Sequence, residues 1–376
     1  MESTQKILLT GATGFVGREL LWRLTRTPQR RVVCLIRAQN PLQANDRLQA
    51  LLDQSQPECL TSEQRSRVCA VAADITKPRL GLSDTEWQQL ADSAVRIIHG
   101  AASVDWAQPL ETARAINVEG TRRMIELAKA AQSRGTLRSF EYMSTCYVCG
   151  RRTGLISEGD LNDTYGFFNS YEQSKFEAEQ LVRGSGLPYY VFRLSMVVGD
   201  SRTGYASTFK VMYWPLKMLS RGMAKAVPAS PKGIVDLVPV DYVCDAMEAL
   251  ATDPHQLGKT FHLAAGPGRS STVGDMINMA VSRFKVSKPL LIPQRFFDLF
   301  VRPILYLIIG SKKRELLKKG RIYRPYFAYG AAFDTAQVRA VLDPAGIIPP
   351  PVQDYFQRLV DYAIASDWGK AGVEAK

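Results

Sequence analysis

Short β-branched, apolar runs alternate with helix-length amphipathic stretches through the first half of the chain, and this alternation restricts the fold more than any other feature. The runs cover residues 6–10, 31–36, 68–72, 95–98, 139–143 and 189–194. Buried strands separated by amphipathic helices predict βαβ units and a doubly wound parallel sheet covered on both faces. Two further strand-like runs, 234–240 and 260–264, bracket a helix-like stretch, so we expect the sheet to continue after an interruption at about 201–233.

The interruption and the last third of the chain predict a second lobe. We expect residues 1–200 and 234–265 to form the α/β core, and residues 201–233 and 266–376 to form a smaller, mainly helical cap built from two separate segments. A chain of 376 residues is long enough for both lobes. Its 46% of apolar and 22% of charged residues exclude a disordered, a collagen-like or a multi-span membrane protein.

The first predicted strand runs directly into a glycine-rich turn. Residues 11–17 read Gly-Ala-Thr-Gly-Phe-Val-Gly and precede an apolar pattern typical of a helix. Gly11 permits a tight turn, Gly14 lets the backbone approach a pyrophosphate, and Gly17 allows close packing of the helix, whose N-terminus then faces the anion. A glycine turn without a ligand is the alternative, but the position in the first strand–helix unit favours a dinucleotide site.

The end of the second predicted strand indicates which dinucleotide binds. Arg37 follows Gly17 by twenty residues, and residues 30–45 contain no Asp or Glu. An acid there would bind the ribose 2′-hydroxyl of NAD, whereas an arginine accommodates the 2′-phosphate of NADP. We therefore predict that the core is a Rossmann-type domain that binds NADP(H). Arg30 and Arg31 are less well placed candidates, and a merely solvent-facing Arg37 is the alternative.

A tyrosine and a lysine four residues apart form the candidate catalytic pair. Tyr171 and Lys175 open a long helical pattern, and their spacing places them on one helix face. An ammonium group beside the phenol is predicted to lower the pKa of the tyrosine, so that it exchanges a proton with a substrate oxygen. The same lysine could hold the nicotinamide ribose. Ser144 and Thr145 end the preceding strand, where a hydroxyl could bind that substrate oxygen.

With these motifs and three further segments, the chain resembles the extended short-chain dehydrogenase/reductases. The segments are Asp74-Ile75, His99-Gly-Ala-Ala102 and Asn117-Val-Glu-Gly-Thr121, and the match covers about the first 265 residues in order. The resemblance implies a catalytic triad of Thr145, Tyr171 and Lys175, with Thr145 rather than Ser144 in the aligned position. Besides Gly11, Gly14, Gly17, Arg37 and Lys175, it implies cofactor contacts at Thr13, Phe15, Val16, Asp74, Ile75, Ala101, Ala102, Asn117 and Ser195.

Within that family the chain resembles the thioester reductase and fatty acyl-CoA reductase branch, which includes the reductive-release domains of carboxylic acid reductases. Residues 33–38, 169–175, 192–200 and 235–243 carry this resemblance. It implies hydride delivery from NADPH to an acyl thioester carbonyl, with Thr145 and Tyr171 holding the oxyanion and Tyr171 supplying a proton. The product would be an aldehyde, or an alcohol after a second hydride. The substrate would be an acyl thioester or another hydrophobic carbonyl compound.

Two other classes of function stay open at this point. The first is an NADP-dependent ketone or hydroxyl oxidoreductase, or an epimerase, acting on a sterol, a polyketide or a sugar-type substrate. Its sugar-nucleotide form is weakened because residues 234–240 contain Asp236 and have only Lys232 nearby in place of an arginine. The second is a non-catalytic, cofactor-sensing protein, which would not need to keep the catalytic triad.

The net charge of +12 is concentrated in a basic, apolar region at residues 283–324, where twelve Lys and Arg residues face only Asp298 and Glu315. Its apolar segment, 296–309, is shorter than the roughly 20 residues that span a bilayer. The region could be a cap helix pair with a solvated charged face. It could instead line an acyl tunnel and receive an acidic carrier protein or coenzyme A, or lie on an anionic membrane surface. Nucleic acid is not expected, since no binding module is recognised.

The remaining reactive side chains indicate neither metal nor disulfide chemistry. Cys146 and Cys149 are expected to continue the strand as ordinary buried thiols. His99, His255 and His262 are too dispersed for a metal site, so none is predicted. A polar N-terminus and six cysteines without evident pairing favour a cytoplasmic location, peripheral to a membrane if residues 296–324 contact one.

Overall fold

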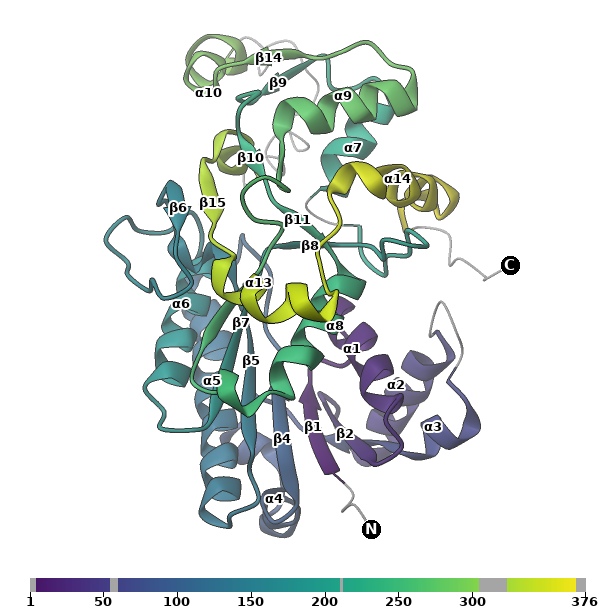
Figure 1. The fold of residues 1–376 in the computed structure, drawn as a ribbon, viewed down its shortest axis with the longest axis vertical. Helices are drawn as coiled ribbons and strands as arrows, with labels where there is room; N and C mark the ends of the chain where they lie inside the picture. Colours follow the sequence, from purple (N-terminus) through teal and green to yellow (C-terminus); the bar gives the residue numbers. More distant parts are fainter. Residues whose placement is uncertain (1–4, 55–59, 210–211, 304–322, 370–376) are drawn as a thin grey trace.

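The computed structural model describes residues 5–54, 60–209, 212–303 and 323–369, and a seven-stranded parallel sheet with helices on both faces occupies its lower half in Figure 1. The strand order is β12-β7-β5-β4-β1-β2-β3. The strands are β1 (Gln5–Thr10), β2 (Arg30–Ile36), β3 (Val68–Ala72), β4 (Ala94–His99), β5 (Ser139–Thr145), β7 (Tyr189–Leu194) and β12 (Thr260–Leu263). This order confirms the predicted Rossmann-type fold. It also places the reversal of strand order between β1 and β4, where open α/β sheets bind ligands.

Alternate side chains of each strand enter two separate apolar cores. Ile7 and Leu9 of β1 pack with one set of helices, and Leu8 between them packs with the other set. The first set comprises α1 (Phe15–Thr25), α2 (Pro41–Asp53), α8 (Val240–Ala251) and α13 (Ala336–Leu342), and the second comprises α4 (Asp84–Ala91), α5 (Leu110–Ser133) and α6 (Ser170–Arg183). A short helix, α3 (Ser62–Ser66), precedes β3. Burial on both faces explains why the strands read as continuous apolar runs.

A third apolar core lies in the upper part of the molecule in Figure 1. It joins α7 (Tyr213–Ser220) to α9 (Val273–Phe284) and α14 (Phe356–Ala365), so segments from both sides of β12 share it. The pair β9 (Ala226–Pro228) and β14 (Leu290–Ile292) lies nearby, followed by α10 (Gln294–Phe296). The division into lobes at the stated boundaries stays a prediction. Within the range predicted for the cap, α13 packs on α8 and β12 of the core.

The strand-like run 234–240 does not continue the main sheet. It divides into β10 (Ile234–Val235), which pairs antiparallel with β13 (Ser271–Thr272), and β11 (Leu237–Pro239), which pairs parallel with β8 (Met196–Val198). Asp236 separates the two pieces, because its buried carboxylate accepts hydrogen bonds from the backbone N–H groups of Ala265 and Gly266, both at 2.9 Å. Only the run predicted at 260–264 joins the sheet, as its edge strand β12.

Much of the predicted basic region, including residues 304–322, lies outside the described residues. In the described part, the guanidinium group of Arg283 contacts Asp361, and those of Arg302 and Arg324 contact Asp298. Acidic side chains therefore compensate part of the positive charge. Within the ranges that the structure describes, no helix combines the length and the apolar character that crossing a bilayer requires.

Candidate active site

The glycine turn between β1 and α1 forms an open cradle. Gly11 has a φ of +78°, and a Cβ atom on it would lie 2.7 Å from the carbonyl carbon of Gly100. A Cβ on Gly17 would lie 2.1 Å from the oxygen of Gly11. Gly14 is the N-cap of α1, and no side chain caps the helix, so its first N–H groups stay available for an anion. Thr13 is exposed beside them, and Phe15 and Val16 are half-buried in the first turn of α1.

Two of the predicted cofactor residues lie at neighbouring strand ends. Arg37 is exposed directly after β2, and Asp74 follows β3. Burial favours the protonated form of Asp74, but hydrogen bonds from Thr76 and the charges of Arg37 and Lys77 outweigh it and lower the pKa of Asp74. Arg37 and Asp74 are therefore close enough to interact. Ile75, the next residue, lies against α5, where a Cβ on Gly120 would come within 2.8 Å of its side chain.

A buried hydrogen-bond network fixes the loop after β4. The hydroxyl of Thr10 lies 2.8 Å from Nδ1 of His99 and accepts the backbone N–H groups of Gly100 and Ala101. Burial lowers the pKa of His99 to about 3, so the imidazole is neutral.

Asn117 holds the same loop from the other side. It accepts the N–H of Ser103 at 2.8 Å and donates to the Ser103 carbonyl and to Ser174 of α6. The loop that contains Ala101 and Ala102 is thus fixed between the first strand and the helix that carries the candidate tyrosine.

The side chains of Ser144 and Thr145, at the end of β5, have different hydrogen-bond partners. Ser144 donates to the buried carboxylate of Glu179 at 2.6 Å. Thr145 donates to the carbonyl oxygen of Leu194 at 3.2 Å and accepts the N–H of Tyr147, and its hydroxyl is close enough to Tyr171 to influence the pKa of the phenol. The side chain that meets the tyrosine is therefore that of Thr145, not that of Ser144.

The pKa of Tyr171 differs in direction from the prediction. Burial raises it to about 12, although the hydrogen bond with Thr145 opposes this shift. The predicted lowering of this pKa by Lys175 is therefore wrong for this arrangement, because desolvation of the phenolate outweighs other effects. The phenol therefore keeps its proton at neutral pH.

Lys175 is buried beneath the end of β5. It is 3% exposed, donates to the carbonyl oxygen of Met143 at 2.7 Å, and lies 4.0 Å from the centre of the Tyr142 ring. Burial lowers its pKa to about 7, and the negative charge of Glu179 opposes the shift.

Ser195 completes the set of predicted residues, in the link between β7 and β8. Its hydroxyl donates to the carbonyl oxygen of Asp236 at 2.9 Å. The structure thus brings Thr145 close enough to Tyr171 to influence its pKa, and it places Arg37 and Asp74 at the adjacent strand ends.

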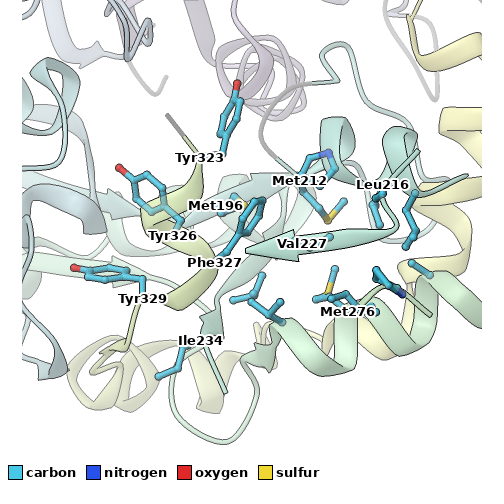
Figure 2. Close-up of a pocket in the computed structure, with 18 of the residues that line it drawn as sticks. Met196, Met212, Leu216, Val227, Ile234, Met276, Tyr323, Tyr326, Phe327 and Tyr329 are labelled. Carbon is cyan, nitrogen blue, oxygen red and sulfur yellow. The ribbon is translucent and has the colours of Figure 1, made fainter. Parts of the chain in front are cut away.

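An apolar pocket of about 130 Å³ includes in its wall Tyr147 and Met196, which follow Thr145 and Ser195 closely along the chain. Figure 2 shows Tyr323, Tyr326 and Tyr329 along one side of it and Met212 and Met276 on the other. Its lining comes mainly from α7, α9, β10 and residues 323–329, and almost all of it is apolar or aromatic.

One buried acid next to the candidate tyrosine was not predicted. Glu172 is 1% exposed, accepts the N–H of Phe168 at 2.8 Å, and accepts the hydroxyl proton of Tyr326. Burial raises the pKa of Glu172 to about 7. The separation of 154 positions between Glu172 and Tyr326 leaves no local sequence pattern that could indicate this contact.

The cysteines of the candidate site are unpaired thiols in a turn, rather than in a continued strand. Cys146–Cys149 forms a 3-10 turn directly after β5, in which Cys146 is buried and Cys149 half-buried. Burial raises the pKa of both thiols, which disfavours the reactive thiolate form. Among the described residues, no cluster of three or more His, Cys, Asp or Glu side chains could hold a metal ion.

Comparison with known proteins adds to this geometry. Residues 9–247 match an NAD-binding family described as male sterility protein. The chain is 34% identical over 278 residues to the nonribosomal peptide synthetase asaC of Aspergillus flavus, covering 69% of this chain and 26% of the synthetase. It is 31% identical over 282 residues to the L-2-aminoadipate reductase large subunit of Penicillium chrysogenum, covering 69% of this chain and 19% of that protein. The chain thus spans about a quarter or less of the length of these relatives.

A solved structure matches almost the whole chain. The terminal R domain from the myxalamid PKS-NRPS biosynthetic pathway superposes with a TM-score of 0.82 at 29% identity, covering 99% of this chain and 93% of that domain.

Proposed function

This chain belongs to the male sterility and thioester reductase family of extended short-chain dehydrogenase/reductases, and we propose that it is an NADPH-dependent reductase of acyl thioesters. One observation carries the proposal: Thr145 lies close enough to Tyr171 to influence the pKa of the phenol, and Tyr147, whose N–H donates to Thr145, belongs to the wall of an apolar pocket. A carbonyl held there would have its oxygen at the hydroxyls and its acyl chain in the pocket.

The glycine positions support a dinucleotide cofactor in the cradle between β1 and α1. Any Cβ on Gly11 or Gly17 would occupy backbone space, and the uncapped N-terminus of α1 offers N–H groups to a pyrophosphate. Arg37, with no acid nearby in β2 or directly after it, supports NADPH over NADH because its guanidinium group suits a 2′-phosphate. Asp74 and Ile75 would flank the adenine, and Ala101, Ala102, Asn117 and Ser195 would line the rest of the trough.

Thr145 and Tyr171 would stabilise the charge that develops on the carbonyl oxygen. When bound, NADPH supplies hydride to the carbonyl carbon. Both hydroxyls would donate hydrogen bonds to the oxygen, that of Thr145 after rotating away from the carbonyl oxygen of Leu194, and such donors stabilise an oxyanion strongly in a water-poor setting. Tyr171, which is protonated at neutral pH, then transfers its proton to that oxygen.

The resulting hemithioacetal breaks its carbon–sulfur bond. The bonding pair leaves with sulfur, which takes up the proton that the hydroxyl group releases, and the products are an aldehyde and a thiol. Tyr171 regains its proton from solvent. Lys175 lies one helical turn away, and we propose that it contacts the nicotinamide ribose. Reduction of the aldehyde by a second hydride would give the alcohol at the same site.

The proposed substrate is an apolar acyl group bound as a thioester to a carrier protein or to coenzyme A. Two features support it: the apolar pocket, and the relation to a nonribosomal peptide synthetase and to a terminal R domain. An acidic carrier protein is the proposed partner of the basic region at 283–324. We also propose a cytoplasmic location, since all five cysteines among the described residues are free, as a reducing compartment would keep them.

A turnover panel tests the proposal. NADPH oxidation would be followed with hexanoyl-CoA, hexanal, a ketosteroid and a 3-ketoacyl thioester, and the products would be identified. We expect oxidation with hexanoyl-CoA and hexanal, with an aldehyde or alcohol as product. Activity only on a ketone would contradict thioester reduction and favour a ketone reductase with the same cofactor site.

A further inference from the structure

The first turn of α6, which carries Tyr171, is held by a side chain from a distant part of the chain. The hydroxyl of Tyr326 donates to Glu172 and accepts the side-chain N–H of Asn169 at 2.7 Å. Asn169 is the N-cap of α6 and accepts the N–H of Glu172 at 3.0 Å. The Tyr326 hydroxyl is thus hydrogen-bonded to Asn169 and to Glu172, which lie on either side of Tyr171 in the sequence.

The ring of Tyr326 belongs to the apolar pocket. It packs on Trp106 at 4.8 Å between ring centres, and it meets Tyr147 edge to face at 5.6 Å. The N–H of Tyr147 donates to Thr145 at 3.3 Å. Tyr326 therefore contacts the acyl pocket with its ring, the turn of Tyr171 with its hydroxyl, and the segment of Thr145 through Tyr147.

Stability alone gives little reason for a carboxylate at this place. A buried acid is costly unless it is paired, and an apolar side chain of similar volume often serves a core as well or better. A cation that acts on Glu172 is Arg151, which lies over the ring of Phe168 at 5.7 Å. The hydrogen bond between Glu172 and Tyr326 joins the pocket wall to α6, and such a link can position the first turn of that helix.

We propose that Glu172 and Tyr326 form a latch that positions Tyr171 for proton transfer when an acyl group packs against the Tyr326 ring. This inference rests on the proposed function, and it makes Glu172 a positioning residue. An acyl chain in the pocket holds the Tyr326 ring in place, and the ring holds the first turn of α6 through its hydroxyl. The acyl group then contributes to the rate of the chemical step, as well as to binding.

The test compares two tyrosines of the same pocket wall. Tyr326→Phe keeps the ring and removes only the hydroxyl, with its hydrogen bonds to Glu172 and Asn169. Tyr329→Phe is the matched control, because the hydroxyl of Tyr329 bonds Gly150 and Cys149 in the loop after β5. Glu172→Gln keeps the shape of the acid. The readouts are kcat and KM with hexanoyl-CoA and with hexanal, the Kd for NADPH, and amide hydrogen exchange of residues 170–175.

A latch predicts that Tyr326→Phe and Glu172→Gln each lower kcat at least about tenfold, since small displacements of catalytic groups are costly. KM and the Kd for NADPH should change less than about twofold, and the double variant should be no slower than either single variant, as expected for one coupled pair. Exchange at 170–175 should be faster in Tyr326→Phe and unchanged in Tyr329→Phe. A rise in KM alone, or equal behaviour of the two tyrosine variants, would overturn the proposal.

Failure of the latch and failure of the proposed function are distinguishable. If the wild-type protein reduces hexanal but not hexanoyl-CoA, thioester reduction is wrong, and the variants are compared on the aldehyde. If it reduces neither, amide hydrogen exchange of residues 170–175 still tests the latch. Faster exchange at 170–175 in Tyr326→Phe alone supports the latch, and equal exchange in both variants contradicts it.

Discussion

Gly17→Ala tests whether the close approach of α1 to the glycine turn is needed for cofactor binding. The new Cβ would lie 2.1 Å from the oxygen and 2.8 Å from the carbonyl carbon of Gly11. Carbon–oxygen contacts below 3.0 Å essentially do not occur, so the helix and the turn must separate by roughly 1 Å. All the atoms involved belong to the backbone, so no side-chain rotation can relieve the clash.

Two opposing energies decide the effect of this substitution on stability. Alanine in a helix is favoured over glycine by roughly 0.5–1 kcal/mol, whereas overpacking costs about 1–3 kcal/mol. We expect the clash to prevail, with a net loss of about 1–2 kcal/mol in the free energy of unfolding and a Tm lower by a few degrees. Displacement of the helix N-terminus should weaken NADPH binding at least about tenfold, or about 1.4 kcal/mol.

Fluorescence titration with NADPH and thermal unfolding measure both effects. Gly159→Ala is the control, because the nearest atom to its Cβ would be the hydroxyl oxygen of Ser157, at 3.9 Å. The control should match the wild type in both assays. If Gly17→Ala bound NADPH within about twofold of the wild type, the assignment of this turn as the pyrophosphate cradle would be refuted.

Four further predictions address the other parts of the site. Tyr171→Phe should lower kcat by about 10²–10⁴-fold and leave the Kd for NADPH nearly unchanged; turnover close to that of the wild type would show that Tyr171 is not the proton donor. Arg37→Asp should weaken NADPH binding about 10–100-fold and NADH binding much less, as separate titrations would show; equal weakening would exclude a 2′-phosphate contact. Ala280→Phe, which fills the pocket from α9, should lower kcat/KM for hexanoyl-CoA at least about tenfold and spare acetyl-CoA, and uniform losses would place the acyl chain elsewhere. Burial lowers the pKa of Lys175 to about 7, so above that pH only the unfolded chain binds this proton, and the free energy of unfolding should rise with pH between about 7 and 10. Urea unfolding of Lys175→Met should lack this contribution, and an unchanged slope would contradict the shift.

The parts of the fold that depend on local pattern could be predicted from the sequence. The apolar strand runs and the glycine turn of residues 11–17 can each be recognised within a short stretch of sequence, and together they predict the parallel sheet. Pairing partners are not local, so the run 234–240 was wrongly assigned to the main sheet. Its division at Asp236 depends on backbone groups of Ala265 and Gly266, which no spacing rule connects to it.

The chemistry of the site was less predictable than its location. The spacing of Tyr171 and Lys175 places them on one helix face, but the direction of a pKa shift depends on how deeply the fold buries each group. Burial raises the pKa of the tyrosine, which sequence spacing alone could not indicate. The contact of Glu172 with Tyr326 depends on the packing of the cap, and the acid alone looks like an ordinary residue in the first turn of a helix.

The pairing of β6 (Gly154–Ile156) with β15 (Ala331–Phe333) has a consequence for the order of events during synthesis of the chain. The glycine cradle and its flanking strands lie within the first 100 residues, whereas the pocket wall at 323–329 and the partner of β6 emerge from the ribosome more than 200 residues later. Because chains fold largely from the N-terminus as they are made, and contacts between distant residues form slowly, the dinucleotide half can take shape first. The acyl pocket is therefore the last part of the site to be completed as the chain is made.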